Sequence, residues 1–252
     1  MNAIVMPPMV PKQTSGWLAL LEVSQRIPVG WSLVGGQLVH LHCVERGQSP
    51  TRPTTDLDTV LDIRGHRSML RQFTEALLDL GFTSAGRSAA GHEHRWLRPD
   101  GAQFDLLIPR HLGDRASKRR GATGATTIEA PGTQQALDRT EKVLVRVGDQ
   151  EGQICRPNLL GALVGKAATS EILIDPGAQR HAADFAVLAS LLSAADLRAE
   201  TISKRDASYL GNMLHLVSQA GLEHEVDGAR RGLNMIRSAV RQRTAPASHP
   251  NT

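Results

Sequence analysis

Three aspartates stand in stretches whose pattern is that of β-strands. Asp56 and Asp58 lie two residues apart in the alternating stretch TTDLDTVLDI, and Asp105 interrupts the apolar stretch FDLLIP. Side chains at positions i and i+2 of a strand share a face, so Asp56 and Asp58 point the same way. A buried carboxylate is costly without a partner. If the two strands are neighbours, the three carboxylates converge on one patch, where they share protons, bind a divalent cation, or lie on a solvated face of the sheet.

A pair of glycines precedes the Asp-x-Asp segment. WSLVGG predicts a short buried strand that ends in Gly35-Gly36, and QLVHLHCVER predicts a helix that opens on these glycines. The backbone N–H groups and the dipole at such a helix start favour phosphate oxygens, and the missing Cβ lets a phosphate approach closely. A phosphate-binding turn beside clustered carboxylates indicates a nucleoside triphosphate held through Mg²⁺. Taken alone, the two glycines are equally consistent with a tight turn.

The order of strand, Gly-Gly, helix, Asp-x-Asp and a later strand aspartate resembles the DNA polymerase β-like nucleotidyltransferase superfamily. The stretch from Gly-Gly to Asp-x-Asp is similar in more detail to the AbiEii-type (abortive-infection) nucleotidyltransferase toxins of bacterial toxin–antitoxin systems. Arg52 and Thr54 stand at that family's basic and hydroxyl positions. The similarity extends over residues 29–192. It departs from the family at Leu38-Val39, where the family has Ala-Leu, and at Ala183, where the family has Lys.

The resemblance implies a divalent-metal nucleotidyltransferase that transfers a nucleotide from an NTP and releases pyrophosphate. The implied metal is Mg²⁺ or Mn²⁺, and the third aspartate would also help to activate the attacking hydroxyl. A lysine in LLGALVGKAAT would neutralise triphosphate charge, oriented by an aspartate in QRHAADFAVL. The implied catalytic residues are Asp56, Asp58, Asp105, Lys166 and Asp184, of which Asp56, Asp58 and Asp105 are also metal ligands, and the implied nucleotide-binding residues are Gly35, Gly36, Arg52 and Lys166.

The acceptor implied by the resemblance is the 3′ end of tRNA, with blocked translation as the outcome and a cognate antitoxin protein as a partner. The net charge of +4 and the pI of about 9.5 weakly favour polyanionic partners. The basic stretch at residues 110–120 would then bind RNA phosphates. Two alternatives are a small-molecule, antibiotic-type nucleotidyltransferase and a catalytically silent module that binds a nucleotide or a partner protein.

The sequence patterns around these residues predict an α+β fold. Strand-like and helical patterns alternate up to residue 156, and the pattern is helical afterwards. We expect an N-terminal arm at 1–13, a polymerase β-like nucleotidyltransferase domain with a mixed sheet at 14–156, a C-terminal helical domain at 157–243 and a disordered tail at 244–252.

Within the first domain, periodicity and turn residues predict each element in order. The expected elements are a helix from Ser15 to Ile27, a strand at 54–64, a helix at 66–80, a hairpin at 91–109 turning at Pro99–Gly101, a polar loop at 110–124, and strands at 127–130 and 142–147. The expected C-terminal helices are 158–169, 181–192, 207–220 and 224–241.

Several other patterns do not indicate a site. GALVGKAA is not a P-loop, because only three residues separate its glycines and Ala167 follows the lysine. The pairs His40/His42 and His92/His94 favour structural roles. Two cysteines without a CxxC pattern exclude a zinc ribbon. The sequence shows no signal peptide and no apolar stretch of membrane-spanning length, which predicts a cytoplasmic protein with no membrane partner.

Overall fold

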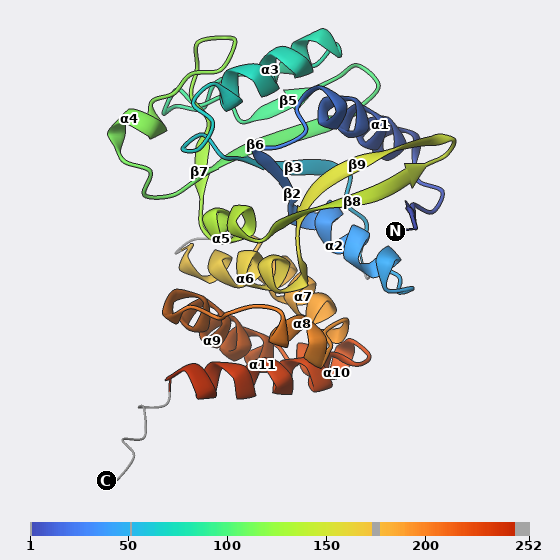
Figure 1. Ribbon diagram of the computed structural model, residues 1–252, viewed down its shortest axis with the longest axis vertical. Coiled ribbons are helices and arrows are strands. Elements are labelled where there is room, and N and C mark those ends of the chain that lie inside the picture. Colours follow the sequence, from blue (N-terminus) through green and yellow to red (C-terminus); the bar gives the residue numbers. More distant parts are fainter. Residues whose placement is uncertain (1, 51, 173–176, 245–252) are drawn as a thin grey trace. The chain divides into compact units, whose positions relative to one another are not determined.

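The computed structural model describes residues 2–50, 52–172 and 177–244 (Figure 1). The chain divides into two compact units, Met1–Gly165 and Lys166–Thr252, whereas the sequence pattern places the change between residues 156 and 157. The expected tail lies outside the described residues except for Thr244, which ends the last helix. In the described parts of the chain, every helix is too short or too polar to cross a lipid bilayer.

A mixed β-sheet forms the centre of the first unit, as the sequence predicts. Its strand order is β2-β3-β6-β5-β4, and β7 also pairs with β6. The β3–β6 and β6–β7 pairs are parallel, and the other pairs are antiparallel. The strands are β2 (Trp31–Val34), β3 (Asp56–Leu61), β4 (Thr83–Ser84), β5 (Arg95–Leu97), β6 (Gln103–Pro109) and β7 (Ile128–Ala130).

A smaller sheet has the order β1-β8-β9, with β1 at Ile4–Val5, β8 at Thr140–Val147 and β9 at Gln150–Pro157. The expected N-terminal arm is therefore not loose throughout. Its residues Ile4 and Val5 pair in parallel with Val145 and Arg146, and Met6 is buried. The pairing satisfies backbone groups of a segment too short to be recognised as a strand by its own pattern.

The helices of the first unit are α1 (Pro11–Arg26), α2 (Gly35–Glu45), α3 (Met69–Asp79), α4 (Asp114–Ser117), α5 (Thr133–Asp138) and α6 (Leu159–Ala168), the last of which crosses into the second unit. α1 begins at Pro11 rather than at Ser15, because the fixed φ of proline suits the first helical position and its missing N–H costs nothing there. The polar loop at 110–124 contains the short α4.

The core of the first unit lies on the face of the sheet opposite to the aspartates. Leu57 and Phe104 alternate with the acids along β3 and β6 and are almost fully buried. Phe104 makes edge-on aromatic contacts with Phe73 of α3 and with Phe82, at ring-centroid separations of 6.4 and 5.2 Å. Large apolar side chains on this face lock the orientation of both strands, which leaves the acids on the other face.

The second unit is helical, as expected. It contains the 3₁₀ turn η1 (Thr169–Glu171) and the helices α7 (Ala178–Ser190), α8 (Ala194–Arg198), α9 (Lys204–Gln219), α10 (Leu222–Glu225) and α11 (Ala229–Thr244). The helix expected at 224–241 is divided at Gly228, whose φ of 77° interrupts the helix. A Cβ at Gly232 of α11 would stand 1.7 Å from the Ala189 carbonyl oxygen, so α7 and α11 pack backbone to backbone.

Candidate active site

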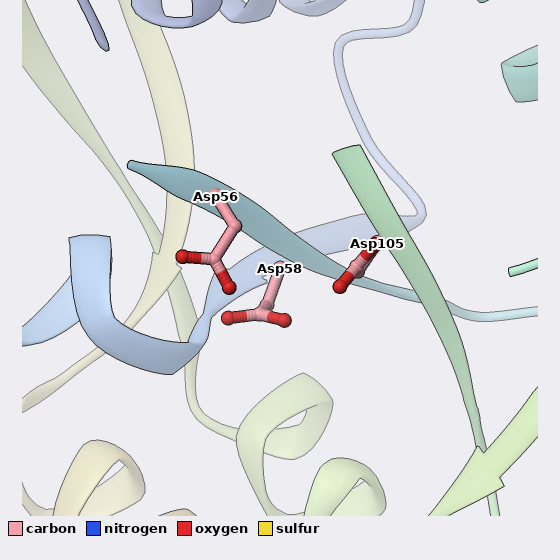
Figure 2. A group of neighbouring side chains, drawn as sticks. All are labelled: Asp56, Asp58 and Asp105. Carbon is pink, nitrogen blue, oxygen red and sulfur yellow. The ribbon is translucent and has the colours of Figure 1, made fainter. Parts of the chain in front are cut away.

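The three aspartates meet at the centre of the larger sheet. β3 and β6 pair in parallel with Asp58 directly opposite Asp105, and Asp56 lies two residues earlier on β3. Figure 2 shows the three carboxylates on one side of these two strands. The adjacency of the two strands was only an inference from the sequence, and the register confirms it.

The aspartates fit a divalent cation. One carboxylate oxygen from each of Asp56, Asp58 and Asp105 lies within 4.8 Å of the others, which is close enough for the three to hold one metal ion. Asp105 is buried, and the other two are half-buried. Carboxylate oxygens are the hard ligands that Mg²⁺ and Mn²⁺ prefer. The donor set therefore matches the metal that the sequence implies.

Gly35 brings the start of α2 into contact with this cluster. Its φ is 72°, and a Cβ added there would stand 1.8 Å from the Asp58 Oδ2. A Cβ at Gly36 would stand 2.7 Å from the Thr54 hydroxyl. The two glycines are thus required by the packing of the Asp-x-Asp segment against the helix start. Because α2 begins at Gly35, its positive end faces the carboxylates and favours anionic groups held beside them.

The loop before β3 is fastened to α2 by side chains of the helix. Gln37 Nε2 donates to the Thr54 carbonyl at 2.7 Å, and the ring of His40 lies 2.8 Å from the Arg52 carbonyl through Nε2. Gln37 is fully buried and also accepts a hydrogen bond from Trp17 at 2.9 Å. The residues that follow the glycines therefore position the acidic strand, a role that the sequence did not reveal.

Asp56 is held in its charged form. The Thr54 hydroxyl donates to the Asp56 Oδ1 at 2.8 Å. Partial burial acts to raise the pKa of the Asp56 carboxyl, but this hydrogen bond, the backbone N–H groups of Asp56 and Thr55, and the charge of Arg52 together hold that pKa below its ordinary value of 3.8. An ionised carboxylate is what a cation site requires.

Asp105 has two side-chain partners that the sequence did not indicate. Arg95 of β5 lies opposite Asp105 in register. Two guanidinium nitrogens donate to the carboxylate, Nε to Oδ1 at 3.0 Å and Nη2 to Oδ2 at 2.8 Å. The Gln103 amide donates to the same two oxygens at 3.3 and 3.2 Å. The third aspartate is therefore oriented by a bidentate, charge-assisted contact.

Two of the histidines that the sequence analysis set aside, His42 and His92, make contacts within the fold. His42 is completely buried, with Arg156 Nη1 at 2.7 Å from its Nδ1 and the Pro157 carbonyl at 3.2 Å from its Nε2. Burial lowers the pKa of His42 to about 4, and Arg156 acts in the same direction. His92 lies 2.7 Å from the Thr126 hydroxyl through Nδ1.

Lys166 and Asp184 form a buried ion pair in the second unit, with Lys166 Nζ at 2.7 Å from Asp184 Oδ2. The side chains are 7% and 3% exposed, so Lys166 is not a solvated surface lysine. The contact agrees with the expectation that Asp184 orients Lys166. The role of Lys166 towards a triphosphate stays a prediction.

Some basic side chains of the 110–120 stretch already have acceptors within the fold. Lys118 Nζ lies 3.4 Å from the exposed Asp114 carboxylate, and Arg120 Nη1 donates to the Gly124 carbonyl at 2.6 Å. Arg115 is exposed. Because the ion pair of Lys118 is exposed, solvent screens it, and it holds the lysine only weakly.

No protein-family model matches the chain, and no curated protein matches it. Among solved structures, the chain is similar to a solution structure of the antibiotic-resistance factor ANT(2'')-Ia, with a TM-score of 0.46 and 12% identity over 86% of this chain and 98% of that chain. It is also similar to a crystal structure of ANT(2'')-Ia in complex with adenylyl-2''-tobramycin, with a TM-score of 0.44 and 12% identity over 79% of this chain and 97% of that chain.

Proposed function

We propose that this protein is a metal-dependent nucleotidyltransferase, which joins a nucleoside monophosphate from an NTP to an acceptor hydroxyl and releases pyrophosphate. The observation that carries the proposal is the parallel β3–β6 register, which brings one carboxylate oxygen from each of Asp56, Asp58 and Asp105 within 4.8 Å of the others, beside the glycine start of α2. A catalytically silent binding module would have no need to hold three carboxylates together against their mutual repulsion.

Five residues of the site are proposed to bind the cation and the nucleotide. Asp56 and Asp58 would hold the divalent cation with the triphosphate, and the start of α2 at Gly35 and Gly36 would attract phosphate oxygens. When bound, the cation neutralises charge that develops on the phosphate oxygens. Arg52, which already acts on the charge of Asp56, is the further cation expected at the nucleotide.

Asp105 would accept the proton of the attacking hydroxyl. The hydroxyl oxygen forms a bond to the α-phosphorus, the bond from this phosphorus to the bridging oxygen of the leaving group breaks, and pyrophosphate departs. Arg95 and Gln103 already direct four N–H contacts at the two Asp105 oxygens. The Gln103 contacts are the longer ones, so an acceptor hydroxyl displaces the amide more easily than the guanidinium.

The acceptor that we propose is the 3′ end of tRNA, which makes the protein the toxin of a toxin–antitoxin pair that blocks translation. The resemblance of the Gly-Gly and Asp-x-Asp motifs, the net charge of +4 and the exposed cations of the 110–120 stretch support this acceptor. A cognate antitoxin protein is the partner expected with it. Lys166, oriented by Asp184, is proposed to neutralise triphosphate charge.

A labelled-transfer assay tests both the reaction and the acceptor. Purified protein is incubated with Mg²⁺ and each α-³²P-labelled NTP, with total tRNA in one arm and an aminoglycoside in the other. Label on tRNA supports the toxin, and label on the aminoglycoside alone supports the small-molecule alternative. Absence of transfer to either acceptor with all four NTPs would contradict the proposal.

A pair of variants ties the activity to the site. Asp58→Asn keeps the shape of the side chain and removes its charge, so transfer should fall by at least about 100-fold. Asp79→Asn removes a carboxylate of α3 that is 71% exposed, and it should leave transfer unchanged. Full activity in Asp58→Asn would show that the cluster is not the catalytic centre.

A further inference from the structure

Arg95 is a cation that already contacts the carboxylate cluster, through Asp105. Its guanidinium lies opposite Asp105 by backbone register, and the two N–H···O contacts of 3.0 and 2.8 Å match the fork geometry of a bidentate pair. The side chain of Arg95 is 47% exposed, whereas that of Asp105 is 9% exposed. The arginine thus approaches the buried acid from the solvent side of the cluster.

The acceptor capacity of Asp105 is used up in this arrangement. A carboxylate has about four lone-pair positions. Arg95 contributes one contact to each oxygen, and Gln103 contributes one further contact to each. A metal ion could bind Asp105 only after one of these donors had left, and repulsion between the ion and the guanidinium means that Arg95 would have to leave as well.

The charge of Arg95 acts on all three acids. The hydrogen bond to Asp105 raises the pKa of Arg95 against the opposing effect of burial, and the negative charges of Asp105, Asp56 and Asp58 act in the same direction as the hydrogen bond. Because the guanidinium of Arg95 neutralises one of the three negative charges, the cluster attracts divalent cations less strongly than three carboxylates without Arg95 would. Without Arg95, the same carboxylates would attract a second cation.

We propose that Arg95 takes the place of a second metal ion, so that the cluster binds one divalent cation at Asp56 and Asp58 while Asp105 stays paired with the guanidinium. Arg95 is in this view the residue that sets the metal stoichiometry of the site. The inference rests on the proposed function, because it concerns the cation of that reaction. It adds that Asp105 serves the acceptor hydroxyl and is not a resident metal ligand.

Direct measurement of Mn²⁺ binding tests the proposed role of Arg95 without any assay of activity. Free Mn²⁺ is measured by electron paramagnetic resonance during titration of the wild-type protein, Arg95→Met and Arg87→Met. Arg87 is the matched control, because it is a half-exposed arginine that pairs with another carboxylate, that of Glu93, at 2.9 Å. Thermal unfolding checks that each variant is folded, and Arg95→Gln replaces Arg95→Met if the latter is not.

The wild-type protein and Arg87→Met should bind one Mn²⁺ per chain. Arg95→Met should bind two, with the first bound about tenfold more tightly, because a positive charge has been removed from the cluster. Two ions in the wild type, or one ion with unchanged affinity in Arg95→Met, would overturn the role of Arg95 and leave the proposed function standing. No Mn²⁺ on any of the proteins would overturn the proposed function as well.

Discussion

Gly35 and Asp58 compete for the same space, since a Cβ on Gly35 would stand 1.8 Å from the Asp58 Oδ2. The two residues belong to different elements, the first turn of α2 and the middle of β3. The glycine therefore sets where the central carboxylate of the cluster can lie. This links the Gly-Gly and Asp-x-Asp motifs through one contact and explains why they occur together.

Gly35→Ala should consequently damage activity more than stability. The added methyl group must displace the Asp58 carboxylate, and a misplacement of about 1 Å at a reacting centre costs about 100-fold in rate. The labelled-transfer assay measures this loss. Gly47→Ala is the matched control, because Gly47 also has a positive φ, 67°, but a Cβ there meets no atom of the described residues within 4 Å. Equal activity losses in both variants would mean that backbone strain alone is responsible.

Thr54→Val should weaken the ionisation of Asp56. The change removes the hydroxyl that donates to Asp56 at 2.8 Å and keeps the shape of the side chain. The pKa of Asp56, now below 3.8, should rise, so the acidic limb of the pH–activity profile should move to higher pH. Mn²⁺ affinity at neutral pH should fall a few-fold, because one of the groups that orient the ligand is lost.

Thr59→Val serves as the comparison on the same strand. The Thr59 hydroxyl is buried and has no hydrogen-bond partner among the described residues. Replacing it by a methyl group should stabilise the protein by about 1 kcal/mol in urea unfolding and leave the pH–activity profile unchanged. A shifted profile in Thr59→Val would show that the effect in Thr54→Val does not come from the hydrogen bond to Asp56.

The acids were predictable because each lies in a strand with period-2 alternation, and Leu57 and Phe104 on the opposite face fix the orientation of these strands. The turn at Pro99–Gly101 also centres the hairpin on Asp100, and residues equally distant from this centre pair. The predicted turn is therefore compatible with the backbone register of Arg95 and Asp105, but the pattern alone did not indicate that their side chains form an ion pair.

Other features depend on partners far away in the chain. β1 is recognisable only through its pairing with Val145 and Arg146. β9 begins with QEGQ, which carries no strand pattern, and forms because every residue of β8 pairs with it. The attachment of the Arg52–Thr54 loop by Gln37 and His40 uses polar side chains whose targets are backbone carbonyls. No spacing rule indicates such contacts.

His42 should make stability depend on pH between about 4 and 6.5. The pKa of His42 is lowered from 6.5 to about 4 in the folded protein, mainly by burial, so below pH 6.5 the unfolded chain binds a proton that the folded chain does not. The stability that the neutral His42 ring contributes to the folded protein is complete above pH 6.5 and is lost as the pH falls towards 4. We expect a loss of about 2 kcal/mol between pH 7 and pH 5 in urea unfolding.

His42→Gln should flatten this dependence, whatever its effect at pH 7. His215→Gln is the control, since His215 is exposed. The neighbouring Glu45 does not titrate in this pH range, because its pKa is lowered from 4.5. Burial acts to raise the pKa of Glu45, but the contacts with His42 and Arg156 outweigh burial. Glu45 therefore stays ionised throughout the range from pH 7 to pH 5. An unchanged slope in His42→Gln would assign the pH dependence to other groups.

The Lys166–Asp184 pair should behave as a buried ion pair whose members depend on each other. Lys166→Met leaves the Asp184 carboxylate, 3% exposed, without the ammonium at 2.7 Å, and should cost about 3–5 kcal/mol in urea unfolding. Asp184→Leu should cost a similar amount for the opposite reason. The double variant Lys166→Met/Asp184→Leu should recover much of the loss, because both charges are gone and the volume is kept.

The double variant also separates folding from chemistry. If Lys166 neutralises triphosphate charge, the refolded double variant should show a raised KM for the NTP and a lowered kcat in the labelled-transfer assay, although its stability is restored. A matched variant on the same helix pair, Gln179→Leu, changes an exposed residue of α7 and should leave both constants unchanged. Recovery of wild-type kinetics together with stability would mean that the pair only holds the second unit together.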